Sequence, residues 1–283
     1  MIVERIDLYK HFGLKRTGQE QGYLTTYARP LHSEEPQNKL RPAMLVVPGG
    51  GYMIVSNREK ECVALEFLRQ GYNCFTLDYS VSPCCYPTQL LEAAMAMLYI
   101  KETAPDFATD NSHVAVIGFS AGAHLAAMLS NVSANKDIDK LLGGRAKDAQ
   151  PNAAVLCYGV VSYDKSNTHI STFNVVSNNG KVDVNKVDPT LLVTDKTAPA
   201  FLWHTADDDV VPFTNSVNYA MALHKHGVPF ELHVFQSGVH GLSLATEETI
   251  GHGRNETNPS AQQWVQLALN WLSQKQGFGI KFQ

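Results

Sequence analysis

Short apolar runs alternate with helical patterns along most of the chain, and this alternation indicates an α/β protein. The runs are typical of strands that are buried on both faces of a sheet. The helical stretches between them have the length that connects parallel strands. We therefore predict a mostly parallel central sheet with helices on both faces. The expected strands cover residues 43–47, 73–77, 113–117, 153–161, 200–204 and 230–235.

Residues that typically begin or end helices mark the limits of the helical segments between the expected strands. Ser56 and Glu59 form a capping-box pattern that predicts a helix as far as residue 67, and Gly71 suits the position just past its end. Gly227 in the same way ends a helix that starts near residue 215. The other expected helices cover residues 88–100 after Pro87, 121–129 after Ser120, and a final helix from a Ser260–Gln263 capping box.

Two regions lack this alternation. Residues 1–40 suggest one or two irregular strands before the main sheet. Residues 164–198 are polar and rich in Asn, Ser and Thr, and a loop of this length inside a domain usually forms a lid or a binding insertion. No repeat or domain boundary interrupts the pattern. We predict one domain over residues 1–283 that carries this insertion as a small lid.

Composition and charge narrow the classes of partner. Apolar residues make up 44% of the chain and charged residues 18%, and the net charge of -4 contains no run of like charges. A protein that binds nucleic acid or an anionic membrane would normally carry a basic patch. No apolar stretch approaches the roughly 18 residues of a membrane span. We expect a small-molecule partner, and the oligomeric state stays open, with a homodimer among the alternatives.

The cysteines and the N-terminus favour a cytoplasmic protein. The chain has five cysteines, an odd number without a CxxC pair, and Glu4, Arg5 and Asp7 lie where a signal peptide would be apolar. The adjacent Cys84 and Cys85 could be redox-active or bind metal, but their spacing fits no metal template. We read them as ordinary residues and expect no metal and no cofactor.

The sequence Gly118-Phe119-Ser120-Ala121-Gly122 is a GxSxG pattern between an expected strand and an expected helix. In that context the serine sits on a strained turn that exposes its hydroxyl group as a nucleophile. The pattern alone is a weak signal, because a serine in this place could simply cap the helix. A catalytic serine also needs a base and an acid, which must come from elsewhere in the chain.

Candidates for both groups follow later strands in the order Ser, Asp, His that is typical of α/β-hydrolases. Asp207, Asp208 and Asp209 follow the strand expected at 200–204, and His240 lies between glycines after the strand at 230–235. The histidine would deprotonate the serine, and an aspartate would orient the histidine. The three aspartates could instead be a solvated turn or a weak calcium loop, but the EF-hand pattern is absent.

The segment Pro48-Gly49-Gly50-Gly51-Tyr52 follows the first central strand. A tetrahedral intermediate needs preorganised N–H donors for its oxyanion, and glycines let the backbone approach the substrate closely. We predict that the amides of Gly50, Gly51 and Ala121 form this oxyanion hole. Tyr52 and Phe119, which flank the two motifs, are predicted to bind substrate. A phosphate-binding loop is the alternative, but no nucleotide-binding pattern is present.

With these motifs in place, the sequence resembles the α/β-hydrolase serine esterases, in particular the bacterial lipase/esterase and acetyl-xylan-esterase-like group. The matching segments are PGGGY at 48–52, LDYSVSP with YP at 77–87, GFSAGAHLA at 118–126, WHTADDDVVP at 203–212 and SGVHGL at 237–242. The resemblance implies an α/β-hydrolase fold and a triad of Ser120, Asp208 and His240. It also selects Asp208, because similar proteins carry the acid four residues before the proline of this turn.

The chain departs from one group of relatives in two ways. Hormone-sensitive-lipase-like proteins usually carry HGGG, where this sequence has Pro48, and the chain has no room for their larger N-terminal cap. Long-chain lipase activity is therefore not expected. The resemblance implies a carboxylesterase that acts on small acyl groups, with acetylated sugars among the candidates.

The sequence is also compatible with two other functions. A serine peptidase of the prolyl-oligopeptidase type shares these motifs, but such enzymes usually carry a large extra domain. A non-catalytic ligand-binding member of the fold commonly loses a residue of the triad, and none is lost here. Turnover of amides against esters, and labelling of Ser120 by a fluorophosphonate, would separate the three hypotheses.

Overall fold

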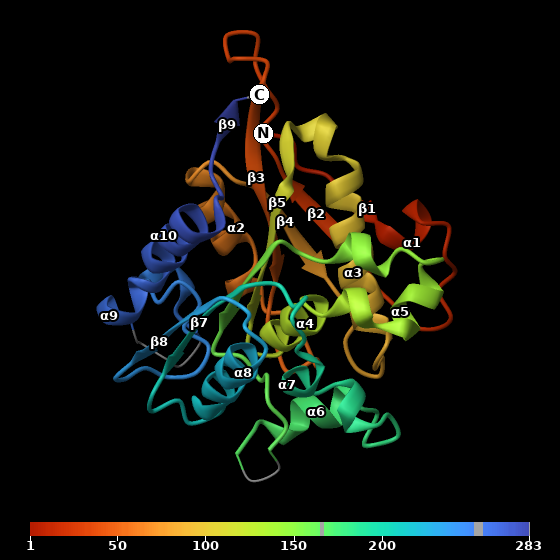
Figure 1. The fold of residues 1–283 in the computed structure, drawn as a ribbon, viewed down its shortest axis with the longest axis vertical. Coiled ribbons are helices and arrows are strands. Elements are labelled where there is room, and N and C mark those ends of the chain that lie inside the picture. The colour runs from red at the N-terminus through yellow and green to blue at the C-terminus, as the bar shows by residue number, and fades with distance from the viewer. Residues whose placement is uncertain (165–166, 252–256, 283) are drawn as a thin grey trace.

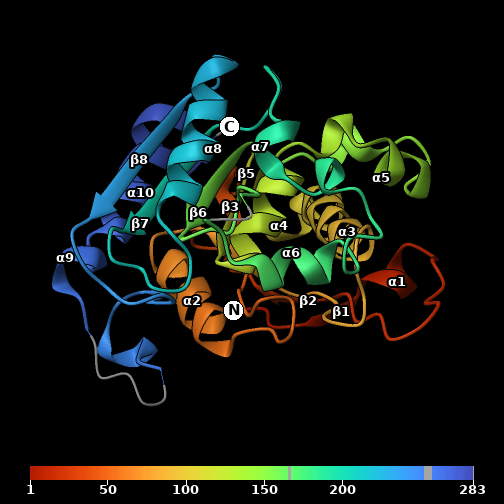
Figure 2. The same cartoon turned by 90° about the horizontal axis from the view of Figure 1, so that it is seen from below.

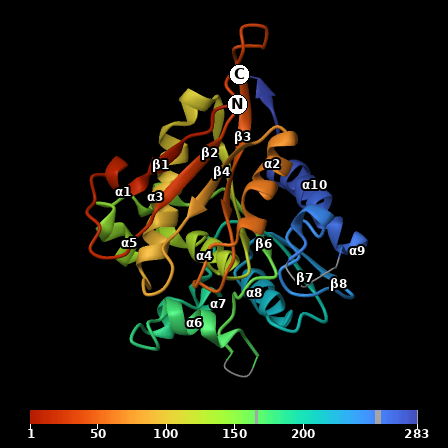
Figure 3. The ribbon, with the colours of Figure 1, turned by 180° about the vertical axis from the view of Figure 1, so that it is seen from behind.

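The computed structural model contains one mixed sheet of nine strands and describes residues 1–164, 167–251 and 257–282 (Figure 1). The strands are β1 (Arg5–Asp7), β2 (Tyr23–Tyr27), β3 (Lys39–Val47), β4 (Asn73–Asp78), β5 (Thr109–Phe119), β6 (Ala153–Cys157), β7 (Ala200–Thr205), β8 (Phe230–Phe235) and β9 (Lys281–Phe282). Eight of them lie in the order β1-β2-β4-β3-β5-β6-β7-β8, and β9 pairs with the start of β3. Neighbours from β4 to β8 are parallel, whereas β1 and β2 add antiparallel strands at one edge (Figure 3). The predicted α/β class with a mostly parallel sheet is confirmed.

Helices cover both faces of this sheet (Figure 2). The helices are α1 (Leu8–His11), α2 (Glu61–Arg69), α3 (Thr88–Glu102), α4 (Ala121–Leu129), α5 (Lys136–Leu141), α6 (Ile170–Val176), α7 (Pro189–Leu192), α8 (Thr214–Lys225), α9 (Pro259–Gln262) and α10 (Trp264–Gln276). One apolar layer lies between the sheet and α3, α4 and α8, and the other lies between the sheet and α2 and α10. No helix in the described ranges is both long enough and apolar enough to span a membrane.

The central strand β3 shows why the apolar runs become buried strands. Ala43, Leu45 and Val47 face the layer of α3 and α4, whereas Met44 and Val46 face the layer of α2 and α10. All five are fully buried. Because successive side chains of a strand point to opposite faces, a strand covered on both sides must be apolar at every position.

Two strand boundaries differ from the sequence pattern. β5 begins at Thr109 rather than at residue 113, so polar residues extend the strand beyond the apolar run. β6 ends at Cys157 rather than at residue 161. Tyr158 has a φ of +39°, in the left-handed region, and this turn takes the chain out of the sheet although the sequence remains apolar.

The capping box predicted at Ser56 and Glu59 is wrong. Ser56 precedes a 3₁₀ turn, Asn57–Glu59, and its side chain makes no capping hydrogen bond. The helix α2 starts only at Glu61, and Glu59 is buried, with 4% of its surface exposed. The motif therefore places a carboxylate in the interior instead of at a helix end.

The last helical region also begins with a different cap. The side chain of Asn258, rather than that of Ser260, accepts a hydrogen bond from the amide of Ala261 at 2.9 Å. The two predicted helix ends are confirmed, since Gly71 and Gly227 follow α2 and α8 with φ of +93° and +70°.

The predicted insertion contains more helix than its polar sequence indicated. From residue 167 onward it holds α6, a 3₁₀ turn (Val184–Lys186) and α7. Figure 1 shows this segment at the lower end of the molecule, and α7 contacts both α4 and α8. His124 of α4 donates its Nε2–H to Val187 O at 2.7 Å, so a buried hydrogen bond ties the insertion to the helix that follows Ser120.

Candidate active site

Ser120 lies on a sharp turn between the end of β5 and the start of α4. Its φ is +53°, in the left-handed region that side chains other than glycine rarely adopt, and its side chain makes no capping hydrogen bond. A Cβ on Gly118 would lie 2.3 Å from Gly122 O, and a Cβ on Gly122 would lie 2.2 Å from Val47 O. Only glycine fits at these two positions, so close backbone approach accounts for the GxSxG pattern.

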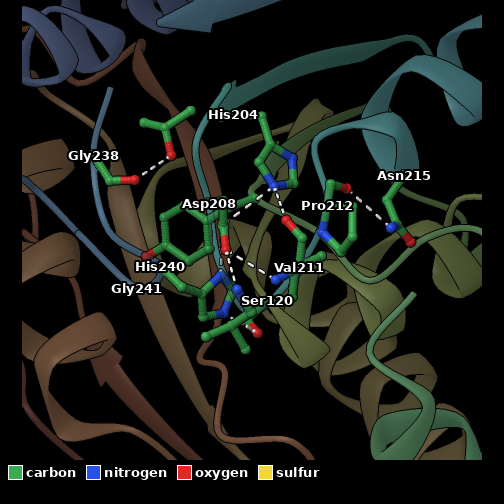
Figure 4. Close-up of polar contacts among 12 residues, drawn as sticks. Ser120, His204, Asp208, Val211, Pro212, Asn215, Gly238, His240 and Gly241 are labelled. Atoms are coloured by element: carbon green, nitrogen blue, oxygen red, sulfur yellow. Dashed lines mark hydrogen bonds and ion pairs between the residues drawn. The ribbon is translucent and has the colours of Figure 1, made fainter. Parts of the chain in front are cut away.

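Ser120, His240 and Asp208 form a hydrogen-bonded line (Figure 4). Ser120 Oγ lies 2.8 Å from His240 Nε2, and His240 Nδ1 lies 2.8 Å from Asp208 Oδ2. The three residues follow β5, β8 and β7 and meet at the carboxyl edge of the parallel strands. The side chain of His240 is 13% exposed and that of Asp208 is fully buried. A solute can therefore approach the serine and histidine end of the line.

The three consecutive aspartates occupy separate environments. Asp207 is exposed, and its Oδ1 accepts a hydrogen bond from the Gly238 amide at 2.7 Å. Asp209 is also exposed. Only the carboxylate of Asp208 contacts the imidazole of His240. The geometry thus selects the same aspartate that the sequence resemblance selects.

The carboxylate of Asp208 is surrounded by donors. Oδ1 accepts the backbone N–H groups of Val210 and Val211 at 3.0 and 2.9 Å. Oδ2 lies 2.8 Å from His240 Nδ1 and 3.3 Å from His204 Nε2. Burial alone would raise the pKa of Asp208, but the hydrogen bonds from His204 and His240 outweigh it and hold the pKa below its usual value. The group stays an anion at neutral pH and can stabilise a positive charge on His240.

His204, the residue before the last of β7, contacts the acid from the other side and was not assigned from the sequence. Its ring is fully buried, with Nδ1 2.8 Å from Ser216 Oγ and Nε2 2.9 Å from Val211 O. Because a carbonyl oxygen only accepts, Nε2 carries the proton that also lies close to Asp208. The only signal in the sequence is its position four residues before the acid, at a strand end.

Gly50 and Gly51 form a tight turn after β3. Their φ angles are +123° and +63°, and a Cβ on Gly50 would lie 2.2 Å from Ile54 O. The Ile54 amide donates to Gly50 O at 3.1 Å and closes the turn. Within the described part of the chain, the amides of Gly50, Gly51 and Ala121 make no hydrogen bond. These three N–H groups are therefore available as donors, as expected of an oxyanion hole.

Tyr52 and Phe119, which were predicted to bind substrate, turn their side chains into the interior, so a contact with substrate would have to come from their backbone atoms. Both side chains are fully buried. The Tyr52 hydroxyl lies 2.8 Å from His124 Nδ1, because the positive φ of Tyr52 turns its ring into the interior. Phe119 is the last residue of β5 and packs against Trp264 on the opposite face of the sheet from α4.

His169 reaches the site from the insertion and was also missed. A Cβ on Gly51 would lie 3.9 Å from His169 Cε1, so the ring stands next to the glycine turn. Thr172 Oγ1 lies 2.8 Å from its Nδ1 and anchors it. Burial, and then the nearby charge of His240, lower the pKa of His169, which keeps the ring neutral at pH 7. Its polar, aperiodic sequence context carries no signal for such a role.

Other reactive groups lie apart from this site. In residues 1–164, 167–251 and 257–282, no cluster of three or more His, Cys, Asp or Glu side chains is arranged to hold a metal ion. All five cysteines are free thiols, and Cys84 and Cys85 are half-buried. The site itself combines a nucleophile, a base, an acid and a set of amide donors.

The chain is similar in sequence to known esterases. The BD-FAE family model matches residues 31–223. An acetylxylan esterase of Xylanibacter ruminicola is 27% identical over 218 residues, which cover 75% of this chain and 43% of that protein. The chain spans only 36% to 51% of the first curated relatives that it matches.

Solved structures match over the whole length of the chain. The carboxylesterase Cest-2923 from Lactobacillus plantarum has a TM-score of 0.85 at 28% identity, with 99% of each chain covered. The acetyl ester-xyloside bifunctional hydrolase from Caldicellulosiruptor lactoaceticus has a TM-score of 0.80 at 30% identity, with 98% of this chain and 97% of that chain covered. The chain therefore belongs to the BD-FAE family of α/β-hydrolase esterases.

Proposed function

We propose that this protein is a serine carboxylesterase that cleaves small esters through an acyl-enzyme on Ser120. The observation that carries the proposal is the 2.8 Å contact between Ser120 Oγ and His240 Nε2, in line with the 2.8 Å contact between His240 Nδ1 and Asp208. A serine hydroxyl is a poor nucleophile until a base removes its proton. This arrangement supplies the base, and behind it the anion that stabilises the protonated base.

Acylation follows from these contacts. His240 Nε2 takes the proton of Ser120 as Oγ attacks the ester carbonyl, and Asp208 stabilises the resulting imidazolium. The carbonyl oxygen becomes an oxyanion, which the amides of Gly50, Gly51 and Ala121 would bind. His240 then gives its proton to the leaving alcohol as the tetrahedral intermediate collapses.

Deacylation repeats the same steps with water in place of the serine hydroxyl. His240 takes a proton from the water that attacks the acyl group, the oxyanion forms against the same amides, and the returned proton restores Ser120. Water thus attacks from the position that the leaving alcohol has vacated. At the end of the cycle Ser120, His240 and Asp208 have regained their original protonation states.

A small acyl group fits the family relationships. The acetylxylan esterase and the acetyl ester-xyloside hydrolase described above are similar to this chain. We infer that acetyl and similarly short esters are substrates, with acetylated sugars among them.

The test combines a substrate series with a serine variant. The wild-type protein should hydrolyse p-nitrophenyl acetate faster than the butyrate and longer esters, and it should release acetate from acetylated xylo-oligosaccharides. Ser120→Ala should abolish turnover and fluorophosphonate labelling without a change in circular dichroism. Faster cleavage of a peptide amide than of the esters would instead indicate a peptidase. An unlabelled wild-type Ser120 would indicate a binding protein.

A further inference from the structure

The 3₁₀ turn Asn57–Glu59 joins the two loops that carry the groups of the proposed reaction. The oxyanion loop comprises residues 49–54, and the histidine loop comprises residues 238–245. They follow β3 and β8, which are separated in the sheet by β5, β6 and β7. The turn makes hydrogen bonds to both loops. It is therefore placed to determine how far apart the two loops lie.

Glu59 holds the start of the oxyanion loop. Its Oε2 accepts the Gly49 amide at 2.8 Å, and a Cβ on Gly49 would lie 2.8 Å from the same oxygen and 3.0 Å from Ser120 Cβ. The glycine is thus held between the carboxylate and the serine. Glu59 Oε1 accepts the hydroxyl proton of Tyr158 at 2.7 Å. Both oxygens of this buried carboxylate are therefore occupied by donors, as a buried charged group requires.

Tyr158 carries the chain of contacts to the histidine loop. Its hydroxyl donates to Glu59 and accepts the Ser243 amide at 2.8 Å. Complete burial raises the pKa of Tyr158 well above its usual value, so the hydroxyl keeps the proton that it donates. Its ring also packs edge-on against the imidazole of His240, with centroids 5.2 Å apart. One side chain thus contacts Glu59, the loop backbone and the base.

Arg58 adds a second connection to the histidine loop. Its guanidinium donates to Gly241 O and, at 3.0 Å, to Thr249 O, and its own carbonyl accepts the Ser243 hydroxyl proton at 2.7 Å. Gly241 and Ser243 have φ of +79° and +54°. Glycine adopts this region readily, but a serine in it holds its conformation only where surrounding contacts impose it.

We propose that Glu59 and Tyr158 are positioning residues that fix the oxyanion amides relative to His240. The proposal rests on the proposed esterase function, because the two loops then act on the same tetrahedral intermediate. The amides bind the oxyanion while His240 moves the proton, and a displacement of about 1 Å between such groups can cost about 100-fold in rate. Neither side chain touches the substrate, so both act through the loops that they hold.

Two substitutions break this chain of contacts without a large change in volume. Tyr158→Phe removes the hydroxyl and leaves Glu59 Oε1 and the Ser243 amide without a partner. Glu59→Gln keeps an oxygen for the Gly49 amide but turns an NH₂ group toward Tyr158, so the hydroxyl proton of Tyr158 loses its acceptor. The matched control is Tyr219→Phe on α8, because the Tyr219 hydroxyl is buried and makes no hydrogen bond in the described ranges.

We expect Tyr158→Phe and Glu59→Gln to lower kcat for p-nitrophenyl acetate by about 10- to 100-fold with KM changed by less than about threefold. Tyr219→Phe should stay within about twofold of wild type. The double variant should be no more than about threefold slower than the slower single variant, since both break one network. The proposal would be overturned if Tyr158→Phe and Glu59→Gln had the same kcat as Tyr219→Phe. It would also be overturned if the loss in the double variant equalled the product of the two single losses.

A second measurement does not depend on turnover. Hydrogen exchange followed by mass spectrometry should show faster exchange in residues 49–54 and 238–245 together in each single variant, and in neither segment of Tyr219→Phe. Exchange that rises only next to the substituted residue would refute the coupling of the two loops. If the wild-type protein hydrolyses no ester, the proposed function fails, and the exchange data still decide whether Glu59 and Tyr158 couple the loops.

Discussion

His240 Nδ1 lies 2.8 Å from Asp208 Oδ2 within a hydrogen bond, and His204 Nε2, which donates to Val211 O, lies 3.3 Å from the same oxygen on the other side. The carboxylate of Asp208 is thereby held as an anion, which can accept hydrogen bonds but cannot donate one. Asp208→Asn would turn an NH₂ group or a neutral oxygen toward His240 and favour the wrong tautomer, so we expect kcat to fall by about 10⁴-fold. Steady-state kinetics with p-nitrophenyl acetate would measure this loss.

The neighbouring aspartates supply the controls for this variant. Asp207→Asn and Asp209→Asn should retain kcat within about threefold, because both side chains are exposed and neither contacts His240 in the structure. A larger loss at either position than at Asp208 would show that the acid is misassigned.

His204 is expected to support both activity and stability. His204→Phe would leave Ser216 Oγ and Val211 O without their buried partner, and it would remove one donor from Asp208. We expect the free energy of unfolding to fall by about 1–3 kcal/mol and kcat to fall by about tenfold. Urea denaturation and kinetics would measure the two effects. Ser216→Ala, which changes only the Nδ1 side of the ring, should retain most of the activity, and an equal loss of kcat there would argue against a role through Asp208.

His169 should influence substrate binding more than chemistry. Its ring stands beside Gly51 but lies outside the hydrogen-bonded line of Ser120, His240 and Asp208. His169→Ala should therefore raise KM several-fold, by removal of about 1 kcal/mol of contact energy, while kcat changes by less than about threefold. Kinetics with acetyl and butyryl esters would test this expectation. The matched control is His226→Ala at the exposed end of α8, and a fall in kcat without a change in KM at residue 169 would contradict it.

The buried Glu92 on α3 should make the free energy of unfolding depend on pH, independently of catalysis. Its carboxyl is fully buried, and burial raises its pKa to about 7, although hydrogen bonds from Ser80 and Tyr9 lower it in part. Between the ordinary value of 4.5 and about 7, the unfolded chain releases this proton while the folded chain retains it. The contribution of this group to the free energy of unfolding is therefore largest below pH 4.5 and is lost as pH rises to about 7.

The corresponding variant is Glu92→Gln, which cannot ionise. Between pH 4.5 and pH 8 the free energy of unfolding of wild type should fall, relative to that of the variant, by an amount on the order of 3 kcal/mol, the free energy of a shift of this size. The variant itself should show no such fall, because its amide does not titrate in this range. Urea titrations at pH 4.5, 6 and 8 would measure the free energy of unfolding of both proteins. If this free energy depended on pH in the same way in wild type and in the variant, Glu92 would not be the titrating group.

Much of the architecture follows from local patterns, because a strand covered on both faces has to be apolar throughout. The runs at 43–47 and 200–204 became β3 and β7, and the residues after three strand ends supplied Ser120, Asp208 and His240. The order of motifs along the chain thus predicted a cluster that forms only in three dimensions. Strand ends could not be predicted as well, since the turn at Tyr158 depends on a backbone conformation that its apolar neighbours do not signal.

The missed residues have a common physical reason. Glu59 fits a local capping pattern equally well whether it caps a helix or lies in the interior, and only tertiary contacts with Gly49 and Tyr158 distinguish the two. Tyr52 and Phe119 are adjacent in sequence to site residues, but adjacency does not determine the direction of a side chain. His169 approaches the site from a segment whose position is set by contacts far from it in sequence.

The buried imidazole of His124 anchors the insertion next to the helix that follows Ser120. Burial lowers the pKa of His124 to about 4, so the ring is neutral, and its two nitrogens are used by Tyr52 and Val187. Displacing Val187 would leave a buried N–H group without an acceptor, and the buried ring of Phe173 on α6 packs edge-on against the same imidazole, with centroids 5.3 Å apart. His124 therefore holds α6 and the residues before α7 at once, and replacing this one imidazole would loosen both parts of the insertion.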